Sequence, residues 1–414
     1  NVYDRYNRLS EVMYPDGLIK RFVYDGNDVV TEMVSSDGKR RCVKEVYNEM
    51  DWLIETVDAG GNKIKYEYFC DGMAKSAQIG NDARTKLSVT YDNCRNRASL
   101  YDPNYGLTTY EYDAWGNVVR IKNPKNAVVE FQYDMSGRMI GKVEKDESGK
   151  SVNSIRWLYS LDKGKNGLLD KVVSTNSHQI DYIYDEKLRL VVKKEEICGR
   201  GYSTSYTYDA ANRLSSIKYP SGLCVLKSYS NSGCEKEIMD AADNKVLWRT
   251  NKTNAYGRVV EYELGDGTNT MISYGAETSL MDNVVVANEK EVIQSYNYFY
   301  DGFGNMTSRM KINGMRMEED FEYDDYDRLT GIRLNGVEKL KMFYDKQGNI
   351  IEKKVDDVRV LYATVYDAEK PNVILKAKTD DERMFSGFRQ NMDYSSFDNL
   401  VGVSNADNFA EVGY

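Results

Sequence analysis

Aspartate and tyrosine are the residues of this sequence whose types and spacing could support chemistry, because they recur along its whole length. The 414 residues include 34 tyrosines and 65 acidic side chains but a single histidine, His178. That scarcity weakens every mechanism built on paired imidazoles, including Ser-His-Asp triads and His-rich metal sites. Carboxylates remain as candidate ligands or acids, and they are densest at Tyr323–Asp327 and at Asp356-Asp357.

These acidic groups have two interpretations. Ca²⁺ takes about six to eight oxygen ligands, and carboxylates could supply some of them. Alternatively, an aspartate that regularly follows a tyrosine caps a turn by accepting backbone N–H groups, which needs no metal. Neither group comes with the glycine-centred loop of an EF-hand. We therefore favour turn capping, and we expect no metal, no cofactor and no catalytic residue.

Other residues that could form a site also have structural interpretations. His178 lies in the polar stretch 175–179 and is predicted to be a solvated loop residue rather than a catalytic base. The glycine-rich segments 58–62 and 265–268 are not followed by a pattern typical of a strand-to-helix transition, so phosphate cradling is not supported. The six cysteines contain no CxxC pair and are predicted to be free, mostly buried thiols, with one or two disulfides as the alternative. The four tryptophans are predicted to pack within the fold: Trp52, Trp115, Trp157 and Trp248.

Composition argues against some partners. The formal net charge of -9 is unfavourable for a general nucleic-acid binder, which needs a basic face. No apolar run reaches the roughly 18 residues of a membrane span, so no membrane insertion is expected. The chain opens at Asn1 with neither an initiator methionine nor a signal-peptide pattern, and we expect it to be a processed or cut-out segment.

Internal repetition organises the chain. A tyrosine, often followed by aspartate, recurs in 17 units with steps of 21 to 26 residues, and we call it the anchor. Tyr159, Tyr229 and Thr253 are weak matches, placed by their spacing. The anchors of repeats 1 to 17 are Tyr3, Tyr24, Tyr47, Tyr68, Tyr91, Tyr112, Tyr133, Tyr159, Tyr184, Tyr208, Tyr229, Thr253, Tyr274, Tyr300, Tyr323, Tyr344 and Tyr366.

Each unit has a pattern typical of two strands joined by a turn. Aromatic residues two positions apart, as at Tyr110 and Tyr112, predict a half-buried strand. Four residues after the anchor, 12 of the 17 units place Gly, Asn or Asp. These types tolerate positive φ best, and after an Asp cap they predict a type I turn closed by a G1 bulge. The residues at this fourth position are Asn7, Asp28, Asp51, Gly72, Gly116, Gly137, Asn212, Gly233, Gly257, Gly304, Asp327 and Gly348.

A second turn, as at Tyr14-Pro15-Asp16-Gly17, separates each unit from the next anchor. Proline suits the second position of a turn but not a paired central strand, so the unit is strand, turn, strand, turn. No helical spacing with end caps occurs before about residue 370. The sequence therefore predicts an all-β, curled antiparallel β-hairpin ribbon over residues 1–375, followed by an irregular capping or partial-repeat tail over 376–414.

These residues carry a family resemblance. The pattern Y-x-Y-D-x-x-G-[NR]-[LVM] resembles the YD repeat of the Rhs family, which includes bacterial polymorphic toxins, the shell subunits of insecticidal Tc toxins and the animal teneurins. The segments 112–117, 133–138, 208–214 and 300–305 all fit it, and the resemblance covers nearly 370 of the 414 residues. It implies that the ribbon forms part of a hollow shell, with toxin or other cargo held inside in the bacterial members.

The resemblance also implies a function. We expect a non-catalytic scaffold or encapsulating shell segment of a larger secreted or surface-delivered bacterial protein, whose partners are flanking repeats and an enclosed cargo or toxin domain. The alternative is a cell-surface adhesion or glycan-binding module, because exposed tyrosines could stack on sugar rings. Bacterial members usually carry an Asp-Pro-x-Gly self-cleavage motif. None occurs here, since the one Asp-Pro, Asp102-Pro103, lies in a repeat turn, and no catalytic residue is carried over.

The residues expected to hold the repeats together are anchor tyrosines, the aspartates that follow them and the turn glycines. They are Tyr3, Tyr24, Tyr112, Tyr133, Tyr208, Tyr300, Tyr323, Tyr344, Asp113, Asp134, Asp209, Asp301, Gly116, Gly137, Gly304 and Gly348.

Overall fold

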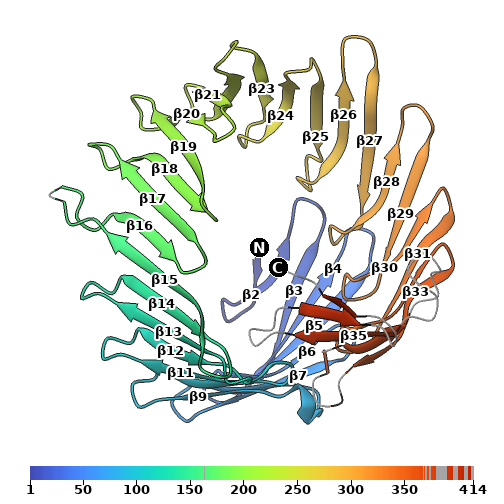
Figure 1. Cartoon of the computed structure of the whole chain (residues 1–414). Helices are drawn as coiled ribbons and strands as arrows, with labels where there is room; N and C mark the ends of the chain where they lie inside the picture. Colours follow the sequence, from blue (N-terminus) through green and yellow to red (C-terminus); the bar gives the residue numbers. More distant parts are fainter. Residues whose placement is uncertain are drawn as a thin grey trace. The chain divides into compact units, whose positions relative to one another are not determined.

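The fold is built from antiparallel strands. The computed structural model describes residues 1–162, 164–366, 368, 371–372, 374–378, 389–394, 400–404 and 409–411. These residues form strands β1 to β37 and one 3-10 turn, η1 (Ala83–Thr85), with no α-helix among them (Figure 1). The all-β prediction is confirmed. No helix in the described part of the chain is long and apolar enough to span a membrane.

The spacing of the strands along the chain follows that of the repeats. The first group is β1 (Val2–Tyr3), β2 (Leu9–Met13), β3 (Ile19–Asp25), β4 (Asp28–Val34), β5 (Arg40–Tyr47), β6 (Leu53–Val57), β7 (Lys63–Tyr68), β8 (Ala74–Ile79), β9 (Leu87–Tyr91), β10 (Arg97–Asp102) and β11 (Gly106–Tyr112). The second is β12 (Val118–Lys122), β13 (Val128–Tyr133), β14 (Met139–Lys145), β15 (Ser151–Tyr159), β16 (Leu169–Ser174), β17 (His178–Tyr184), β18 (Leu190–Ile197), β19 (Arg200–Tyr208), β20 (Leu214–Lys218), β21 (Cys224–Tyr229), β22 (Glu235–Asp240), β23 (Val246–Thr253), β24 (Val259–Leu264), β25 (Asn269–Tyr274) and β26 (Met281–Ala287). The third is β27 (Val292–Tyr300), β28 (Met306–Lys311), β29 (Met317–Tyr323), β30 (Leu329–Leu334), β31 (Val337–Tyr344), β32 (Ile350–Val355), β33 (Val358–Tyr366), β34 (Ile374–Lys378), β35 (Arg389–Tyr394), β36 (Leu400–Ser404) and β37 (Phe409–Glu411).

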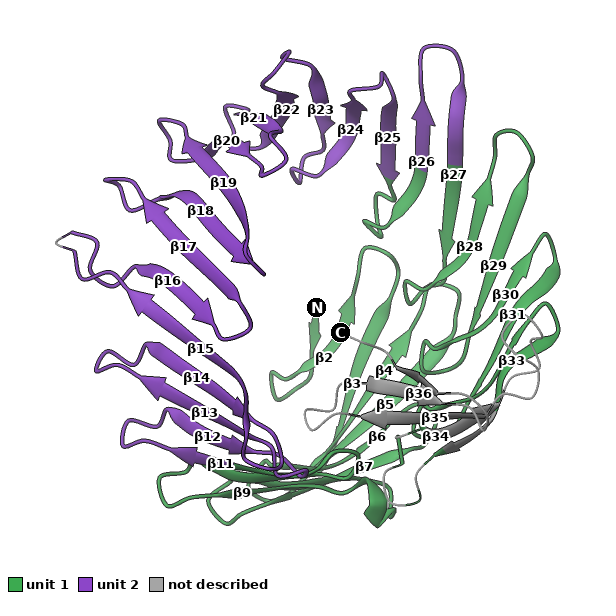
Figure 2. Cartoon of the chain, in the orientation of Figure 1, with its two compact units in different colours: residues 1–109, 274–283, 296–414 green, residues 110–273, 284–295 purple. Residues whose placement is uncertain are grey.

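The chain divides into two compact units, each a run of neighbouring strands (Figure 2). Unit 1 comprises residues 1–109, 274–283 and 296–414, and unit 2 comprises residues 110–273 and 284–295. Within each unit, strands that are consecutive in the sequence pair antiparallel. In most repeats the residue six after the anchor pairs with the anchor itself, as Met139 does with Tyr133 and Leu214 with Tyr208. Much of the tail predicted over 376–414 lies outside the described residues.

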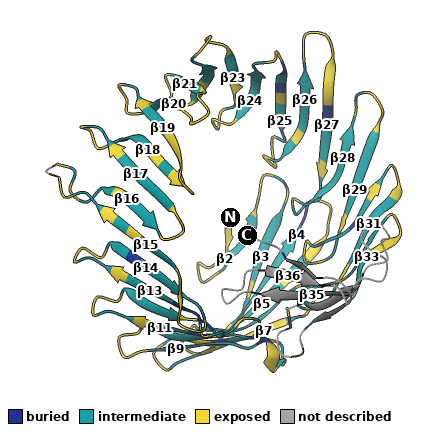
Figure 3. Ribbon diagram, viewed as in Figure 1, coloured by how far each residue is buried: buried dark blue, intermediate teal, exposed yellow. Residues whose placement is uncertain are grey.

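The sheet has little interior. Among the described residues, the buried apolar side chains are Ala127, Val128 and Val225, and no large side chain is fully buried. Most strand residues are half-buried (Figure 3). A single layer leaves each face only partly covered. The six cysteines are free, as predicted, but five of them are exposed rather than buried. Trp115 was predicted to pack within the fold, but it lies at a turn tip and is 82% exposed.

Two turns alternate along the ribbon. We call the turn that follows each anchor the anchor turn, and the turn that precedes the next anchor's strand the return turn. The predicted bulge geometry is present in the anchor turns, since Gly116, Gly137, Gly304 and Gly348 have φ of 84°, 74°, 89° and 90°. Return turns close in the same way, as at Gly17, whose φ is 82° and whose N–H donates to the Tyr14 carbonyl.

One of the twelve fourth-position predictions is wrong. Asp28 is paired with Asp25 at the start of β4, and the chain reverses through Gly26 and Asn27, with φ of 59° at Gly26. A two-residue loop matches the strand twist without a bulge, so no positive φ is needed at Asp28. The other eleven positions all have positive φ, and so do Arg95 and Leu188, the fourth residues of repeats 5 and 9.

Replacing Gly137 with valine should destabilise the protein by about 1 to 3 kcal/mol, because a β-branched residue is strained at positive φ. An added Cβ at Gly137 would meet no heavy atom within 4 Å, so the cost is conformational rather than steric. Gly137→Asn is the matched control, since Asn212 occupies the same turn position at φ 63°. Urea melts check this prediction, and equal stability of the Val and Asn variants would contradict it.

Candidate functional site

The aspartate after each anchor holds its turn closed. In repeat 6, Oδ1 of Asp113 accepts the backbone N–H groups of Trp115 and Asn117, both at 2.9 Å. Its Oδ2 accepts the side-chain amide of Asn117, also at 2.9 Å. We call this set of bonds the aspartate clamp. The backbone bonds recur at Asp4, Asp92, Asp134, Asp185, Asp301, Asp324 and Asp345, and Asp209 accepts the Arg213 N–H in the same way.

Arginine at the fifth position after the anchor connects one repeat to the next. In repeat 7, Nε of Arg138 donates to Oδ2 of Asp134 at 2.7 Å. The same guanidinium lies 4.5 Å from the ring centroid of Tyr159, the anchor of repeat 8. Such a cation over an aromatic face contributes about 0.5 to 1 kcal/mol at exposed sites. Equivalent arginines join Asp185 to Tyr208, Asp209 to Tyr229 and Asp324 to Tyr344.

The anchor hydroxyl forms a second connection between neighbouring repeats. The hydroxyl of Tyr133 donates to the carbonyl oxygen of Val118 at 2.9 Å, where Val118 starts the strand that follows the preceding anchor turn. We call this bond the tyrosine latch. Ten further latches of 2.8 to 3.1 Å join Tyr24 to Leu9, Tyr68 to Leu53, Tyr159 to Met139, Tyr184 to Leu169, Tyr208 to Leu190, Tyr229 to Leu214, Tyr300 to Met281, Tyr323 to Met306, Tyr344 to Leu329 and Tyr366 to Ile350.

Repeat 12, which lacks an anchor tyrosine, keeps both the register and a latch. Thr253 pairs with Val259 as the tyrosine anchors pair with their sixth residues, so its placement by spacing is correct. The latch comes from another residue, however. The hydroxyl of Thr250 donates to the Glu235 carbonyl at 3.0 Å, and the strand is irregular between Thr250 and Thr253.

The pKa values of the latch tyrosines and of the clamp aspartates are shifted in opposite directions. Burial raises the pKa of the Tyr133, Tyr300 and Tyr323 hydroxyls, which keeps them protonated as donors. The Arg138 guanidinium holds the pKa of Asp134 below its ordinary value, and the Asn117 amide does the same for Asp113. Both shifts favour the protonation states that the hydrogen bonds require.

A third set of contacts joins repeats that are far apart in the sequence, all of them within unit 1. The anchor turn of repeat 14 meets the return turn of repeat 2. Gly302 approaches that turn so closely that an added Cβ would lie 2.5 Å from Cβ of Ser35 and 2.9 Å from the backbone nitrogen of Ser36. The Arg41 guanidinium lies 3.9 Å from the ring centroid of Phe303, the third residue after the anchor.

The anchor turn of repeat 15 makes the equivalent contact with repeat 3. Arg41 donates to both carboxylate oxygens of Asp327, at 2.6 and 2.7 Å. The hydroxyl of Tyr326, again the third residue after the anchor, bonds with the side chains of Asn62 and Asp58. An added Cβ at Gly60 would overlap that hydroxyl. The bidentate pair raises the pKa of Arg41 and lowers that of Asp327.

These contacts have a constant offset. Repeat 14 docks on repeat 2 and repeat 15 on repeat 3. In repeat 17, the N–H of Asn372 donates to Oδ1 of Asn104 in the return turn of repeat 5, at 2.8 Å. Each of these three anchor turns thus meets the return turn that lies twelve repeats earlier. We call this line of contacts the seam.

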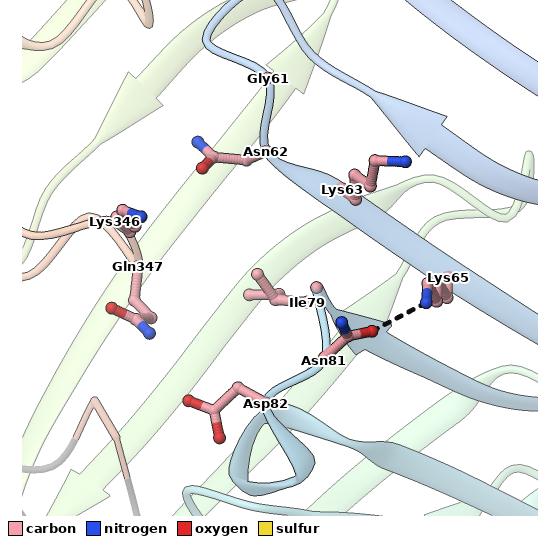
Figure 4. A pocket seen from close by; sticks show the side chains of 10 residues that line it. Gly61, Asn62, Lys63, Lys65, Ile79, Asn81, Asp82, Lys346 and Gln347 are labelled. Carbon is pink, nitrogen blue, oxygen red and sulfur yellow. Dashed lines mark hydrogen bonds between the residues drawn. The ribbon is translucent and has the colours of Figure 1, made fainter.

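A pocket of about 550 Å³ lies on the seam between repeats 4 and 16. Figure 4 shows Lys346 and Gln347 on one side and Asn62, Ile79 and Asp82 on the other. Its lysines Lys63 and Lys65 bond with Glu55 and Asn81, both at 2.8 Å. Because these two amines are already engaged, the pocket fits a gap between docked turns.

The acidic groups considered as calcium sites serve other purposes in the structure. Asp324 forms a clamp, Asp327 pairs with Arg41, and Asp356 pairs with Nζ of Lys339 at 2.5 Å. No group of three or more potential ligands capable of holding a metal ion occurs among the described residues. His178 was predicted to lie in a loop, but it begins β17, because the preceding turn ends at Ser177. Its Nε2 lies 2.8 Å from Oε1 of Glu195.

Two family models match this chain. The teneurin YD-shell model matches residues 39–200, and the RHS repeat model matches residues 198–223. The resemblance to the Rhs/YD-repeat family is confirmed. The anchor turns of repeats 3 to 10 lie within the matched residues, and we also call an anchor turn a YD turn.

Known proteins are similar to this chain. The chain is 24% identical over 242 residues to double-stranded DNA deaminase toxin A of Burkholderia cenocepacia (strain H111). The match covers 57% of this chain and 14% of that protein. The chain is also 24% identical over 257 residues to tRNA nuclease WapA of Bacillus subtilis (strain 168). That match covers 56% of this chain and 10% of that protein. A solved structure of the Photorhabdus luminescens Tc holotoxin pore has a TM-score of 0.80 at 15% identity, over 98% of this chain and 24% of that chain. The last likeness shows the fold, and the chain spans a small part of each of these proteins.

Sequence reasoning missed the seam. Its most visible signal is glycine where the turn itself needs none. Gly302 stands two residues before Gly304, and Gly60 stands beside Gly61, yet only Gly304 and Gly61 have positive φ. A glycine that the turn conformation does not require indicates a close approach by another segment.

Tyr133→Phe should destabilise the protein by about 0.5 to 1.5 kcal/mol, because it removes one hydrogen bond while keeping the ring. Burial raises the pKa of this hydroxyl, so its contribution is present below the ordinary tyrosine pKa of about 10 and is lost above it. The gap between parent and variant should therefore narrow above about pH 10. Urea melts at several pH values measure it, with Tyr182→Phe, outside the set of latches, as control; a variant as stable as the parent at pH 7 would contradict the latch.

Asp134→Asn should weaken the clamp without abolishing it. Asn254 shows that an amide oxygen can accept both backbone N–H groups, here from Tyr256 and Arg258 at 3.0 Å. The variant loses the charge and the acceptor oxygen that face Arg138, because an amide nitrogen takes the place of Oδ2. Because the pKa of Asp134 is lowered, its contribution is present above the ordinary aspartate pKa of about 4 and is lost as the pH falls through the folded-state value. Urea melts should show a stability gap at pH 7 that closes toward pH 3, and a gap of constant size would refute the assignment.

Gly302→Ala should loosen the seam at repeat 2, because overpacking costs about 1 to 3 kcal/mol. Met135→Ala is the matched control, since it changes the same turn position in repeat 7, where the side chain is fully exposed. Amide hydrogen exchange provides the measurement. The amides of residues 35–39 should exchange faster in the Gly302 variant and at the parent rate in the Met135 variant, and unchanged exchange in both would mean that the seam does not hold these turns together.

Proposed function

We propose that this chain is a non-catalytic scaffold, a segment of an encapsulating shell within a larger secreted or surface-delivered bacterial protein, and that the shell houses a toxin or other cargo. The observation that carries the proposal is the contrast between its relatives. One is named for deamination of double-stranded DNA and the other for cleavage of tRNA, yet each is 24% identical to this chain over more than half of its residues. A segment common to proteins with different reactions supports a role other than either reaction.

The chemistry of the repeats supports the same role. The groups that recur along the repeats have structural partners, since nine aspartates form clamps such as that of Asp113 and eleven anchor tyrosine hydroxyls form latches such as that of Tyr133. The acidic groups that stood out in the sequence are paired with arginine or lysine. The proposed partners are therefore flanking repeats of the same polypeptide and the cargo, reached through surfaces rather than through an active site.

A cell-surface adhesion or glycan-binding module is the second candidate, and one observation favours it. Trp115 and Tyr256 are 82% and 81% exposed, and exposed aromatic rings can stack on sugars. A glycan array probed with the 414-residue chain tests this candidate. Selective binding that is lost in Trp115→Ser would favour adhesion over encapsulation.

Limited proteolysis of the protein at its natural full length tests encapsulation. Its non-repeat portion should resist protease in the parent and in the Met135→Ala control. In Gly302→Ala, whose seam is loosened, the same portion should be digested faster. Digestion at one rapid rate in all three proteins would overturn the encapsulating role, and turnover of double-stranded DNA or tRNA by the 414-residue chain alone would overturn the non-catalytic one.

A further inference from the structure

The third residue after the anchor lies at the tip of each YD turn, and its exposure depends on docking. In the seam, Phe303 lies beneath the Arg41 guanidinium and Tyr326 is 38% exposed. At the same position, Trp115 of repeat 6 is 82% exposed and Tyr256 of repeat 12 is 81% exposed. These two large rings occupy the turn position that makes the docking contact in the seam, yet most of their surface is exposed.

The turn itself does not require an aromatic tip. Ser136, Ala211 and Ser232 stand at the same position in repeats 7, 10 and 11. A large ring that is exposed to water does not stabilise its own repeat through burial. Tryptophan and tyrosine are enriched at the centres of protein interfaces. Exposed aromatic tips on some repeats only are therefore typical of contact points for another surface.

The seam indicates what that surface is. Each docked turn meets a return turn that has small residues at the point of approach. In repeat 14, Gly302 approaches Ser35 and Ser36, and in repeat 15 the tip residue Tyr326 approaches Gly60. The offset is twelve repeats toward the N-terminus in each case. Counting twelve repeats back from repeats 6 and 12 gives positions before Asn1.

We propose that Trp115 and Tyr256 dock on return turns of YD repeats that precede Asn1 in the same polypeptide. The YD turns of repeats 6 and 12 then have seam partners of the same kind as those of repeats 14, 15 and 17. The length of the matched relatives agrees with further sequence, since the chain covers 14% and 10% of them. The inference deepens the proposed shell role, on which it rests by assuming a longer run of repeats.

Site-specific photo-crosslinking tests the proposal in the protein at its natural full length. The photoreactive residue p-benzoylphenylalanine replaces Trp115 in one preparation and Tyr256 in another. A third preparation carries it at Phe303, where peptides containing residues 35–41 should be captured and so calibrate the method. The matched control is position 183, because Ile183 is a 41% exposed apolar residue on a strand face rather than a turn tip. Mass spectrometry of the digests identifies the captured peptides.

Positions 115 and 256 should each capture a peptide from a return turn upstream of Asn1, and position 183 should not. Capture from a second copy, detected by mixing isotopically light and heavy protein, would overturn the proposal, as would capture of another molecule or no capture while position 303 reacts. Protease protection is read separately. Protection without capture would reject this docking and leave the shell role standing, whereas capture without protection would reject encapsulation alone.

Discussion

The hydrogen bond that eleven of the anchor tyrosines donate to the preceding repeat is the interaction on which the rest of this structure depends. A sheet of one layer cannot bury large side chains, and no large side chain among the described residues is fully buried. Stability must then come from connections between neighbours within the layer. The tyrosine supplies two of them at once, because its ring covers the adjoining strand and its hydroxyl reaches the carbonyl at the bulge, as Tyr133 reaches Val118.

The turn chemistry follows from that requirement. A bulged turn opens the strand pairing after each anchor, so backbone N–H groups there need another acceptor. The following aspartate provides it, and at Asp134 the same carboxylate also orients Arg138 over the next anchor ring. The residue types of the motif are thus parts of one bonded chain that runs from the turn of one repeat to the ring of the next.

Local rules were sufficient to predict most of this layer. Alternating aromatics and turn residues at fixed spacing gave the strands, the two turns and the positive φ at Gly137 and Asn212. They failed at Asp28, where a tighter loop closes the hairpin, and at Leu188, because leucine gives no signal for the positive φ that the repeat imposes on it. The exposure of the cysteines was missed for a different reason, since burial depends on how many layers the fold has, which no short pattern encodes.

The seam could not be predicted, because its partners are separated by most of the chain. Arg41 and Asp327 are 286 positions apart, and neither residue is unusual in its own repeat. The seam also changes the energetics. In a linear array each repeat interacts only with its neighbours, so damage stays local and unfolding is broad. Contacts twelve repeats apart join repeats 2, 3 and 5 with repeats 14, 15 and 17, so these repeats must open together. In repeats 6 to 12, strand pairing, clamps, latches and arginine contacts join each repeat to its neighbours. The cooperativity of the fold therefore depends on how many of its turns have a seam partner.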